Sequence, residues 1–176
     1  MGLVPWGGAI IRGLLSSGQL PAGEILAFNR SRERLRSLEA EFSLPVAPNA
    51  HRVAQEAEYL LLGVKPYGIA PLLADLADSL VHKPVVISIA AGTPIAKIEE
   101  HLPGKTPLVR VMPNVNAQIG QSMSGIAANQ YVSAQALSEV RAMFESIGKT
   151  ALVAEEHFAI FFGSRWLFPC LGVPVY

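Results

Sequence analysis

Three glycines at the beginning of the chain have almost the spacing of a phosphate-binding loop. Gly2 and Gly7 stand at the first and third glycine positions of the pattern G-x-G-x-x-G, Val4 stands at the second, and Gly8 follows directly. In the intact pattern the glycines permit a tight turn, close approach of the backbone to a pyrophosphate and close helix packing. The spacing therefore predicts a dinucleotide-binding loop in which a β-branched side chain obstructs the middle contact.

A second set of polar residues, Asn29, Arg30 and Ser31, follows this loop at the distance where such domains bind the ribose. An acid at this point would bind the ribose hydroxyls of NAD, but this set contains none. Arginine beside amide and hydroxyl donors suits the 2′-phosphate of NADP. The alternative is a helix start with solvated arginines. We favour the phosphate interpretation and expect NADP as the cofactor, with NAD possible.

Three predicted strands end in turns that would lie at one edge of a parallel sheet, where ligands bind in open α/β sheets. The first turn supplies a lysine that can reach a phosphate or carboxylate, although a solvated lysine at a strand end is the commoner case when that turn is taken alone. The second contains only small residues, which leave room for a flat ring, and the third contains an amide. The residues are Val64, Lys65 and Pro66; Ala90, Ala91 and Gly92; and Met112, Pro113 and Asn114.

No residue is identified as a general acid, a nucleophile or a metal ligand. Arg110 lies inside a predicted strand and can pair with an acid, whereas the pairs Glu99-Glu100 and Glu155-Glu156 are expected to be solvated. The histidines lack metal-ligand spacing, and Cys170 has no activating neighbour. Hydride transfer is compatible with this pattern, because the cofactor carries that chemistry.

Apolar strands alternate with amphipathic helices along the chain, which predicts an α/β domain with a doubly wound, mostly parallel, Rossmann-like sheet over residues 1–155. No residues precede the glycine loop to form the usual first strand, so we expect that strand to be missing or incomplete. Ser31, Thr93 and Ser133 are predicted helix N-caps, and Gly148 is a predicted helix stop. Strands are predicted at 24–28, 46–47, 59–64, 85–89, 108–112, 124–128 and 151–153, and helices at 9–15, 32–42, 49–56, 69–80, 94–102 and 134–147.

The composition excludes several classes of protein. Of 176 residues 51% are hydrophobic and 16% are charged, which predicts a folded core rather than disorder. The net charge is zero, so neither nucleic-acid binding nor electrostatic membrane attachment is expected. A single cysteine and the absence of a signal-peptide pattern favour the cytoplasm. The apolar stretch 158–176 is interrupted by Arg165, Pro169 and Pro174, which argues against a membrane span.

Taken together, these motifs resemble pyrroline-5-carboxylate reductase, the NADPH- or NADH-dependent enzyme of the last step of proline biosynthesis. The resemblance covers about residues 7–158, and its markers are residues 9–14, 29–31, 64–66, 88–92 and 110–114. It implies reduction of 1-pyrroline-5-carboxylate, a cyclic imino acid, to L-proline. It also implies that the glycine loop, residues 29–31, Asn49, and residues 64–66 and 90–92 line the cofactor groove, with residues 112–114 near the nicotinamide.

Two departures from the family pattern bear on the activity. Val4, Pro5 and Trp6 replace the second glycine, the asparagine and the methionine of the family's loop, and the strand before the loop is absent. Residues 156–176 form an atypical apolar tail in place of the helical domain that forms the homo-oligomer and holds the substrate. We therefore expect a chain truncated at both ends, with impaired activity and marginal stability. The alternatives are a non-catalytic or inert fragment and a reductase similar to the β-hydroxyacid dehydrogenases.

Overall fold

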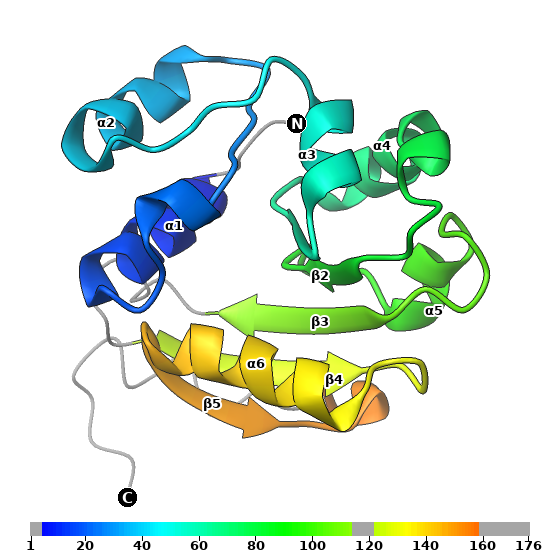
Figure 1. The fold of residues 1–176 in the computed structure, drawn as a ribbon. Helices are drawn as coiled ribbons and strands as arrows, with labels where there is room; N and C mark the ends of the chain where they lie inside the picture. Colours follow the sequence, from blue (N-terminus) through cyan, green and yellow to red (C-terminus); the bar gives the residue numbers. More distant parts are fainter. Residues whose placement is uncertain (1–4, 114–121, 159–176) are drawn as a thin grey trace, which may run out of the picture.

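A five-stranded sheet lies at the centre of the molecule (Figure 1), with the strand order β1-β2-β3-β4-β5. The computed structural model describes residues 5–113 and 122–158. β1, β2 and β3 are parallel, β4 is antiparallel to β3, and β5 is parallel to β4. The predicted mostly parallel, Rossmann-like sheet is therefore confirmed. The strands are β1 (Tyr59–Leu62), β2 (Val85–Ser88), β3 (Leu108–Pro113), β4 (Ser122–Ala128) and β5 (Gly148–Leu152).

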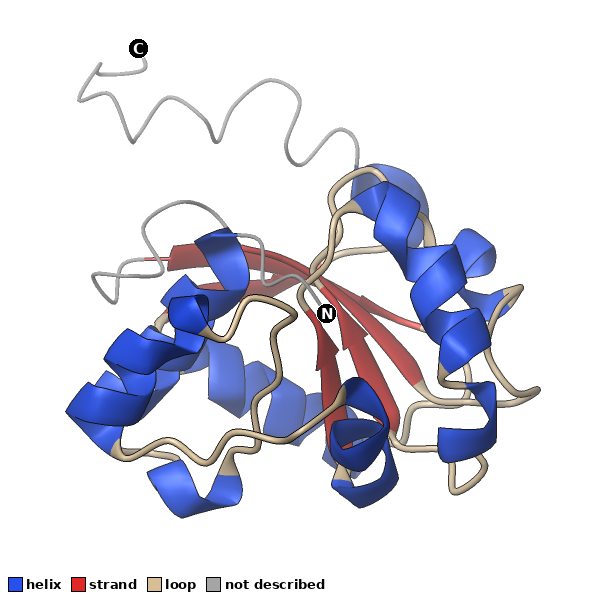
Figure 2. Ribbon diagram, turned by 90° about the horizontal axis from the view of Figure 1, so that it is seen from above, coloured by secondary structure: helices blue, strands red, loops and turns tan. Residues whose placement is uncertain are grey.

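Helices cover both faces of this sheet (Figure 2), as its continuous apolar strands require. Leu60, Leu62 and Val86 pack against α3, α4 and α5 on one face. Ile87 and Val109 pack against α1 and α6 on the other. The helices are α1 (Pro5–Ser17), α2 (Glu33–Phe42), α3 (Ala50–Glu56), α4 (Ile69–Asp75), α5 (Ile95–Glu99) and α6 (Ala134–Glu145). Short 3₁₀ turns are η1 (Ala22–Glu24), η2 (Pro66–Gly68), η3 (Ala77–Ser79) and η5 (Glu155–His157).

The segment between α1 and α3 forms a smaller core with α1. Ile11, Leu15, Leu35 and Leu38 are buried there together with Ala27. The strands predicted at 24–28 and 46–47 are reduced to one isolated parallel bridge between Ala27 and Val46. Within the described part of the chain no strand pairing joins this bridge to β1.

Two helix starts differ from their predictions. α2 begins after Arg32, whose side chain makes no cap, so the prediction that Ser31 is the N-cap is wrong. The Ser31 N–H donates instead to Asn29 Oδ1 at 3.1 Å, and this turn precedes the helix. The N-cap of α5 is Pro94 rather than Thr93. In both cases a residue next to the predicted one takes the cap position, because the turn before the helix sets its start.

The predicted start of α6 is correct, whereas its predicted end and the predicted length of the helix at 69–80 are not. Ser133 caps α6 as predicted, because its side chain accepts the Ala136 N–H. Gly148 does not end α6, whose C-cap is Ser146; it is the first residue of β5. The helix predicted over 69–80 is split into α4 and η3 at Leu76, although Leu76 and Leu80 are buried as the pattern requires. None of the described helices is both long and apolar enough to cross a membrane.

Candidate functional site

The carboxyl ends of three parallel strands lie at the same height along one edge of the sheet. Leu62 pairs in register with Ser88, and Ser88 pairs with Arg110. Residues two positions further on each strand, Val64, Ala90 and Met112, are therefore level with one another. This is the edge at which the sequence placed three of its candidate groups, and the structure brings these groups together along it (Figure 1).

Each of these turns combines inward-packed residues with outward-facing ones. Val64 is 7% exposed and Ala90 is 3% exposed, so both anchor their turns in the core. Lys65 and Pro66 are exposed, and Lys65 Nζ lies 5.9 Å from the centre of the Tyr67 ring. Ala91 and Gly92 are exposed, Met112 and Pro113 are half-buried, and Asn114 lies outside the described residues.

Gly92 is held in the left-handed region, with a φ of 68°. A side chain here would be strained by this backbone conformation, which explains the glycine. A Cβ built at this position meets no atom within 4 Å. The surface above the turn after β2 is therefore open to a ligand that approaches the backbone.

Asn29 is the buried polar residue of the second candidate group. It is 4% exposed, and its Oδ1 accepts the Ser31 N–H. Its Nδ2 is buried and has no hydrogen-bond partner among the described residues. Buried polar atoms are almost always paired, so this donor points to an acceptor supplied by a ligand or by water.

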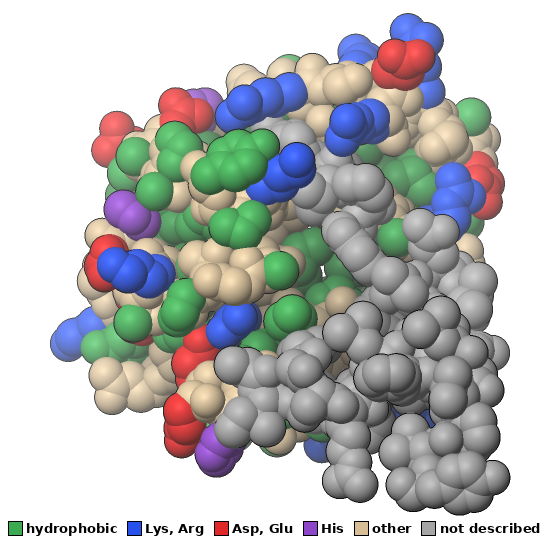
Figure 3. Space-filling view, turned by 180° about the vertical axis from the view of Figure 1, so that it is seen from behind, with side chains coloured by type: hydrophobic (Ala, Val, Ile, Leu, Met, Phe, Trp, Pro, Cys, Tyr) green, Lys and Arg blue, Asp and Glu red, His purple; other side chains and the backbone are tan. Residues whose placement is uncertain are grey.

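Arg30 and Ser31 are exposed beside Asn29, and the first turns of α2 add Arg32, Arg34 and Arg36 to the same region. Figure 3 shows basic side chains gathered along the upper edge of the molecule, the side on which α2 lies. Arg32 forms an ion pair with Glu39 at 3.6 Å. Arg30 makes no ion pair within the residues that the structure describes. An exposed guanidinium that has no carboxylate partner can bind a phosphate.

Three further candidate residues have structural positions that the geometry explains by itself. Asn49 is the N-cap of α3, and its Oδ1 accepts the Arg52 N–H at 2.8 Å. Gly7 and Gly8 lie inside α1, which begins at Pro5, rather than in a loop before it. Gly7 is buried, Gly8 has open space where a Cβ would be, and Gly2 lies outside the described residues.

Arg110 pairs with an acid, as its position inside a strand predicted. Its Nη1 donates to Glu155 Oε1 at 2.7 Å, and the Ile95 N–H donates to the same oxygen at 3.1 Å. The guanidinium also lies 4.4 Å from the centre of the Phe158 ring. The prediction that Glu155 is solvated is wrong, because a buried arginine charge requires a carboxylate close by.

Glu99 is likewise not simply solvated, since its Oε1 accepts from Asn129 Nδ2 at 2.8 Å. Glu155 was missed as a site-forming residue by sequence reasoning. The available signal was an arginine between apolar strand residues, which demands a partner acid somewhere later in the chain. Arg110 Nε and Glu155 Oε2 are buried without hydrogen-bond partners within the described residues, as is Thr93 Oγ1.

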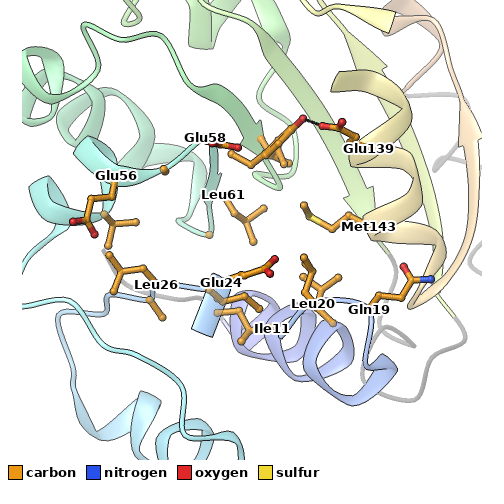
Figure 4. Close-up of a pocket in the computed structure, with 18 of the residues that line it drawn as sticks. Ile11, Gln19, Leu20, Glu24, Leu26, Glu56, Glu58, Leu61, Glu139 and Met143 are labelled. Carbon is orange, nitrogen blue, oxygen red and sulfur yellow. Dashed lines mark hydrogen bonds between the residues drawn. The ribbon is translucent and has the colours of Figure 1, made fainter. Parts of the chain in front are cut away.

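The histidines are exposed or half-exposed. His51 Nδ1 is 3.1 Å from Ser79 Oγ, and His82 Nε2 is 3.0 Å from the Ala57 carbonyl. In the described part of the chain no three His, Cys, Asp or Glu side chains gather as metal ligands would. A cavity of about 770 Å³ lies between β1 and residues 26–28 (Figure 4), and its lining includes Phe28 and Gly63, which directly precede the candidate residues Asn29 and Val64. Sequence reasoning did not identify the residues that line it.

Comparisons with known proteins show which family the chain belongs to. The model of the family described as "NADP oxidoreductase coenzyme F420-dependent" matches residues 2–92. The chain belongs to this family. Because the family name specifies an NADP oxidoreductase, the fold is that of an oxidoreductase domain that binds a nicotinamide dinucleotide.

Individual relatives confirm the resemblance to pyrroline-5-carboxylate reductase. The enzyme of that name from Staphylococcus haemolyticus is 31% identical over 150 residues, which are 85% of this chain and 55% of the relative. The Streptococcus pyogenes structure of that name has a TM-score of 0.80 at 30% identity, covering 97% of this chain and 64% of that one. The Coxiella burnetii structure has a TM-score of 0.86 at 26% identity, with the same coverage. The chain spans about half the length of the curated relatives it matches.

Proposed function

We propose that this chain contributes the NADPH-binding part of an oxidoreductase of proline biosynthesis, which reduces 1-pyrroline-5-carboxylate to L-proline. The observation that supports this most is the level edge formed by Val64, Ala90 and Met112 on three adjacent parallel strands. Relatives named pyrroline-5-carboxylate reductase supply the substrate class. The cytoplasm and a homo-oligomer are part of the proposal.

The residues present fit a dinucleotide at this edge. Asn29 has an unpaired buried donor, Arg30 is an exposed cation, and the turn at Gly92 leaves the backbone accessible. In this proposal Asn29, Arg30 and Ser31 bind the 2′-phosphate end. Asn49, residues 64–66 and 90–92 line the middle of the groove, residues 112–114 lie near the nicotinamide, and Gly2, Gly7 and Gly8 lie near the pyrophosphate.

The cofactor, when bound, supplies a hydride to the carbon of the substrate's carbon–nitrogen double bond, and the nitrogen takes up a proton. The described residues of this chain bind and orient the cofactor; we assign none of them to the proton transfer. The expected activity is low, because Val4 stands at a contact position of the loop.

Calorimetric titration with NADPH and NADH tests the cofactor assignment. We expect saturable binding of NADPH, and a loss of about 10-fold or more in NADPH affinity for Arg30→Glu, because a charge-assisted contact contributes about 1.5–3 kcal/mol. NADH binding should change little. Arg36→Glu, which changes an exposed arginine of α2, is the matched control.

Equal weakening of NADPH and NADH binding by Arg30→Glu would refute the 2′-phosphate assignment. A proline-forming assay, followed by loss of NADPH absorbance, tests the substrate separately. Turnover at the rate of a complete reductase would refute the expected impairment, whereas NADPH binding without turnover agrees with it.

A non-catalytic fragment is the second candidate function. It is favoured by one observation, that α1 already begins at Pro5 and includes Gly7 and Gly8 in its first turns. A helix that begins so early leaves little loop to surround a pyrophosphate. A folded chain that binds neither NADPH nor NADH in the titration would establish this candidate.

A further inference from the structure

The hydrogen-bonded ladder between β2 and β3 ends before the candidate cofactor turns begin. Its last register pair is Ser88 with Arg110. The turn at residues 90–92 and Met112, which the proposed function places along the cofactor, both lie beyond that pair. Met112 is paired with Gly125 of β4, on its other side. The described ladder therefore does not fix the distance between this turn and the end of β3.

The turn after β2 is held at both of its ends. At its start, the Ala90 N–H donates to Ser88 Oγ at 3.3 Å. At its end, the Ile95 N–H donates to Glu155 Oε1 at 3.1 Å. Between the two lies Gly92 in the left-handed conformation, with a φ of 68°. One side chain of β2 and one from the segment after β5 thus fix the two ends of the turn.

The first turn of α5 takes a hydrogen-bond acceptor from a distant part of the chain. Its N-cap residue is Pro94, which makes no side-chain cap hydrogen bond. Thr93 Oγ1 is buried and has no hydrogen-bond partner within the residues that the structure describes. A helix start needs acceptors for its free N–H groups, and here Glu155 supplies one from 60 positions later in the chain. The place where the turn ends and α5 begins therefore depends on Glu155.

The same oxygen of Glu155 also holds β3. Arg110 Nη1 donates to Glu155 Oε1 at 2.7 Å, and the arginine side chain is 8% exposed. Arg110 Nε and Glu155 Oε2 are buried without partners among the described residues, so the pair lacks the two parallel hydrogen bonds that arginine often forms with a carboxylate. Both donors converge on a single atom. Loss of that atom releases the start of α5 and β3 together.

We propose that Glu155 is a positioning residue of the cofactor site. By binding Ile95 and Arg110 through one oxygen, it keeps the turn at residues 90–92 at a fixed distance from Met112. The proposed function, on which this role rests, places these residues along the middle and the nicotinamide end of the dinucleotide. A ligand loses less free energy in ordering a turn that is already fixed, so Glu155 increases the affinity for the cofactor without contacting it.

The role of Glu155 concerns one half of the cofactor. Asn29 and Arg30, which the proposed function assigns to the 2′-phosphate, follow the opposite wall of the cavity, beyond β1. The polar contacts of Glu155 among the described residues go to β3 and α5. Removal of its carboxylate should therefore weaken binding of the whole dinucleotide and leave binding of the 2′-phosphate half unchanged.

Calorimetric titration compares NADPH with adenosine 2′,5′-bisphosphate, which has the 2′-phosphate half and no nicotinamide. Glu155→Leu should lower the NADPH affinity about 5-fold or more and change the affinity for the bisphosphate less than about 2-fold. The double variant Arg110→Met with Glu155→Leu should do the same. It removes both charges, and replacing a buried ion pair by apolar residues is often neutral for stability, so this variant stays folded where the single one does not. Glu156→Gln, an exposed neighbouring change, is the matched control and leaves both affinities unchanged.

Recovered stability without recovered NADPH affinity in the double variant is the decisive result, with urea unfolding as the measure of stability. Hydrogen exchange supplies a second readout without any ligand, since the Ile95 amide loses its acceptor and should exchange about 5-fold faster or more in the double variant. Full NADPH affinity in that variant, unchanged exchange at Ile95, or an equal loss for both ligands overturns the role of Glu155. If the unchanged chain binds neither ligand, the proposed cofactor site and this role are both wrong.

Discussion

Arg110 carries a charge in the interior of the sheet, and a small number of contacts keep it there. Its side chain is 8% exposed, Glu155 neutralises it, and the Phe158 ring lies against the guanidinium. Glu155 also accepts the Ile95 N–H, so one carboxylate ties the segment after β5 to β3 and to the start of α5. The stability of this region depends on a single acid.

Glu155→Gln should destabilise the folded chain by about 3 kcal/mol, because it leaves a buried arginine without its counter-charge. The measurement is the free energy of unfolding in urea. Glu156→Gln is the control, since Glu156 is exposed and adjacent. Equal stability of the two variants would mean that solvent reaches Arg110.

Tyr59 and Glu139, which both line the cavity between β1 and residues 26–28, form a second residue pair. Burial, followed by the hydrogen bond to Glu139 and by nearby negative charge, raises the pKa of Tyr59 to about 12. The same hydrogen bond lowers the pKa of Glu139. The stability linked to Tyr59 is present below its ordinary pKa of about 10 and is lost as the pH rises through the folded value.

In a spectrophotometric titration, the last tyrosinate absorbance to appear should be that of Tyr59, near pH 12. Tyr59→Phe should remove that late component and leave the earlier ones unchanged. Glu139→Gln should move it to lower pH, because the acceptor loses its charge. A titration in which Tyr59→Phe removes an early component instead would contradict the hydrogen bond.

At the scale of single elements, α3 shows how one residue serves two assignments. Asn49 caps this helix through its Oδ1, and the family resemblance also places it in the cofactor groove. A cap needs only an acceptor oxygen, which aspartate supplies equally well. A residue near a dinucleotide phosphate, by contrast, cannot become an anion without repelling it.

Asn49→Ala should therefore destabilise the chain by about 1 kcal/mol, the usual effect of losing an N-cap. Asn49→Asp should restore that stability while weakening NADPH binding several-fold. The measurements are urea unfolding and calorimetric titration on the same preparations. If Asn49→Asp binds NADPH as well as the unchanged chain does, Asn49 is only a cap.

Elements were predictable where the sequence contains the whole signal. The buried runs of β1, β2 and β3 and the Ser133 cap of α6 depend on residues in or next to the element, and all were predicted. Strands at 24–28 and 46–47 were predicted from the same kind of run, but they need a neighbour to pair with. Only the bridge between Ala27 and Val46 forms, since pairing partners are a property of the sheet.

At the scale of the whole molecule, the cavity between β1 and residues 26–28 is a feature that no local pattern contains. The sequence did not show that Leu26 and Leu61 would line a common cavity. Similarly, the level edge at Val64, Ala90 and Met112 depends on the register between strands. The strand ends were predictable as candidates, and their alignment was not.

NADPH should stabilise the whole fold if the proposed site is correct. At a concentration of about 100 times its Kd, a ligand of the native state adds about 2.7 kcal/mol, which corresponds to about 5–10 °C for a chain of this size. Differential scanning calorimetry with and without NADPH measures this change. Arg30→Glu should reduce the shift at the same concentration, and an undiminished shift would contradict the role of Arg30.

The cavity separates the residues of the proposed cofactor site into two groups, one on each side. Asn29 and Arg30 follow one wall, and Val64, Ala90 and Met112 follow the other. A dinucleotide that contacts both groups of residues is a bivalent ligand. Its affinity depends on the effective concentration of the second group once the first is bound. Separate halves of the cofactor are insensitive to that spacing. If the distance between the two groups of residues varies, the affinity for the whole dinucleotide falls. The affinity for each separate half of the cofactor stays unchanged.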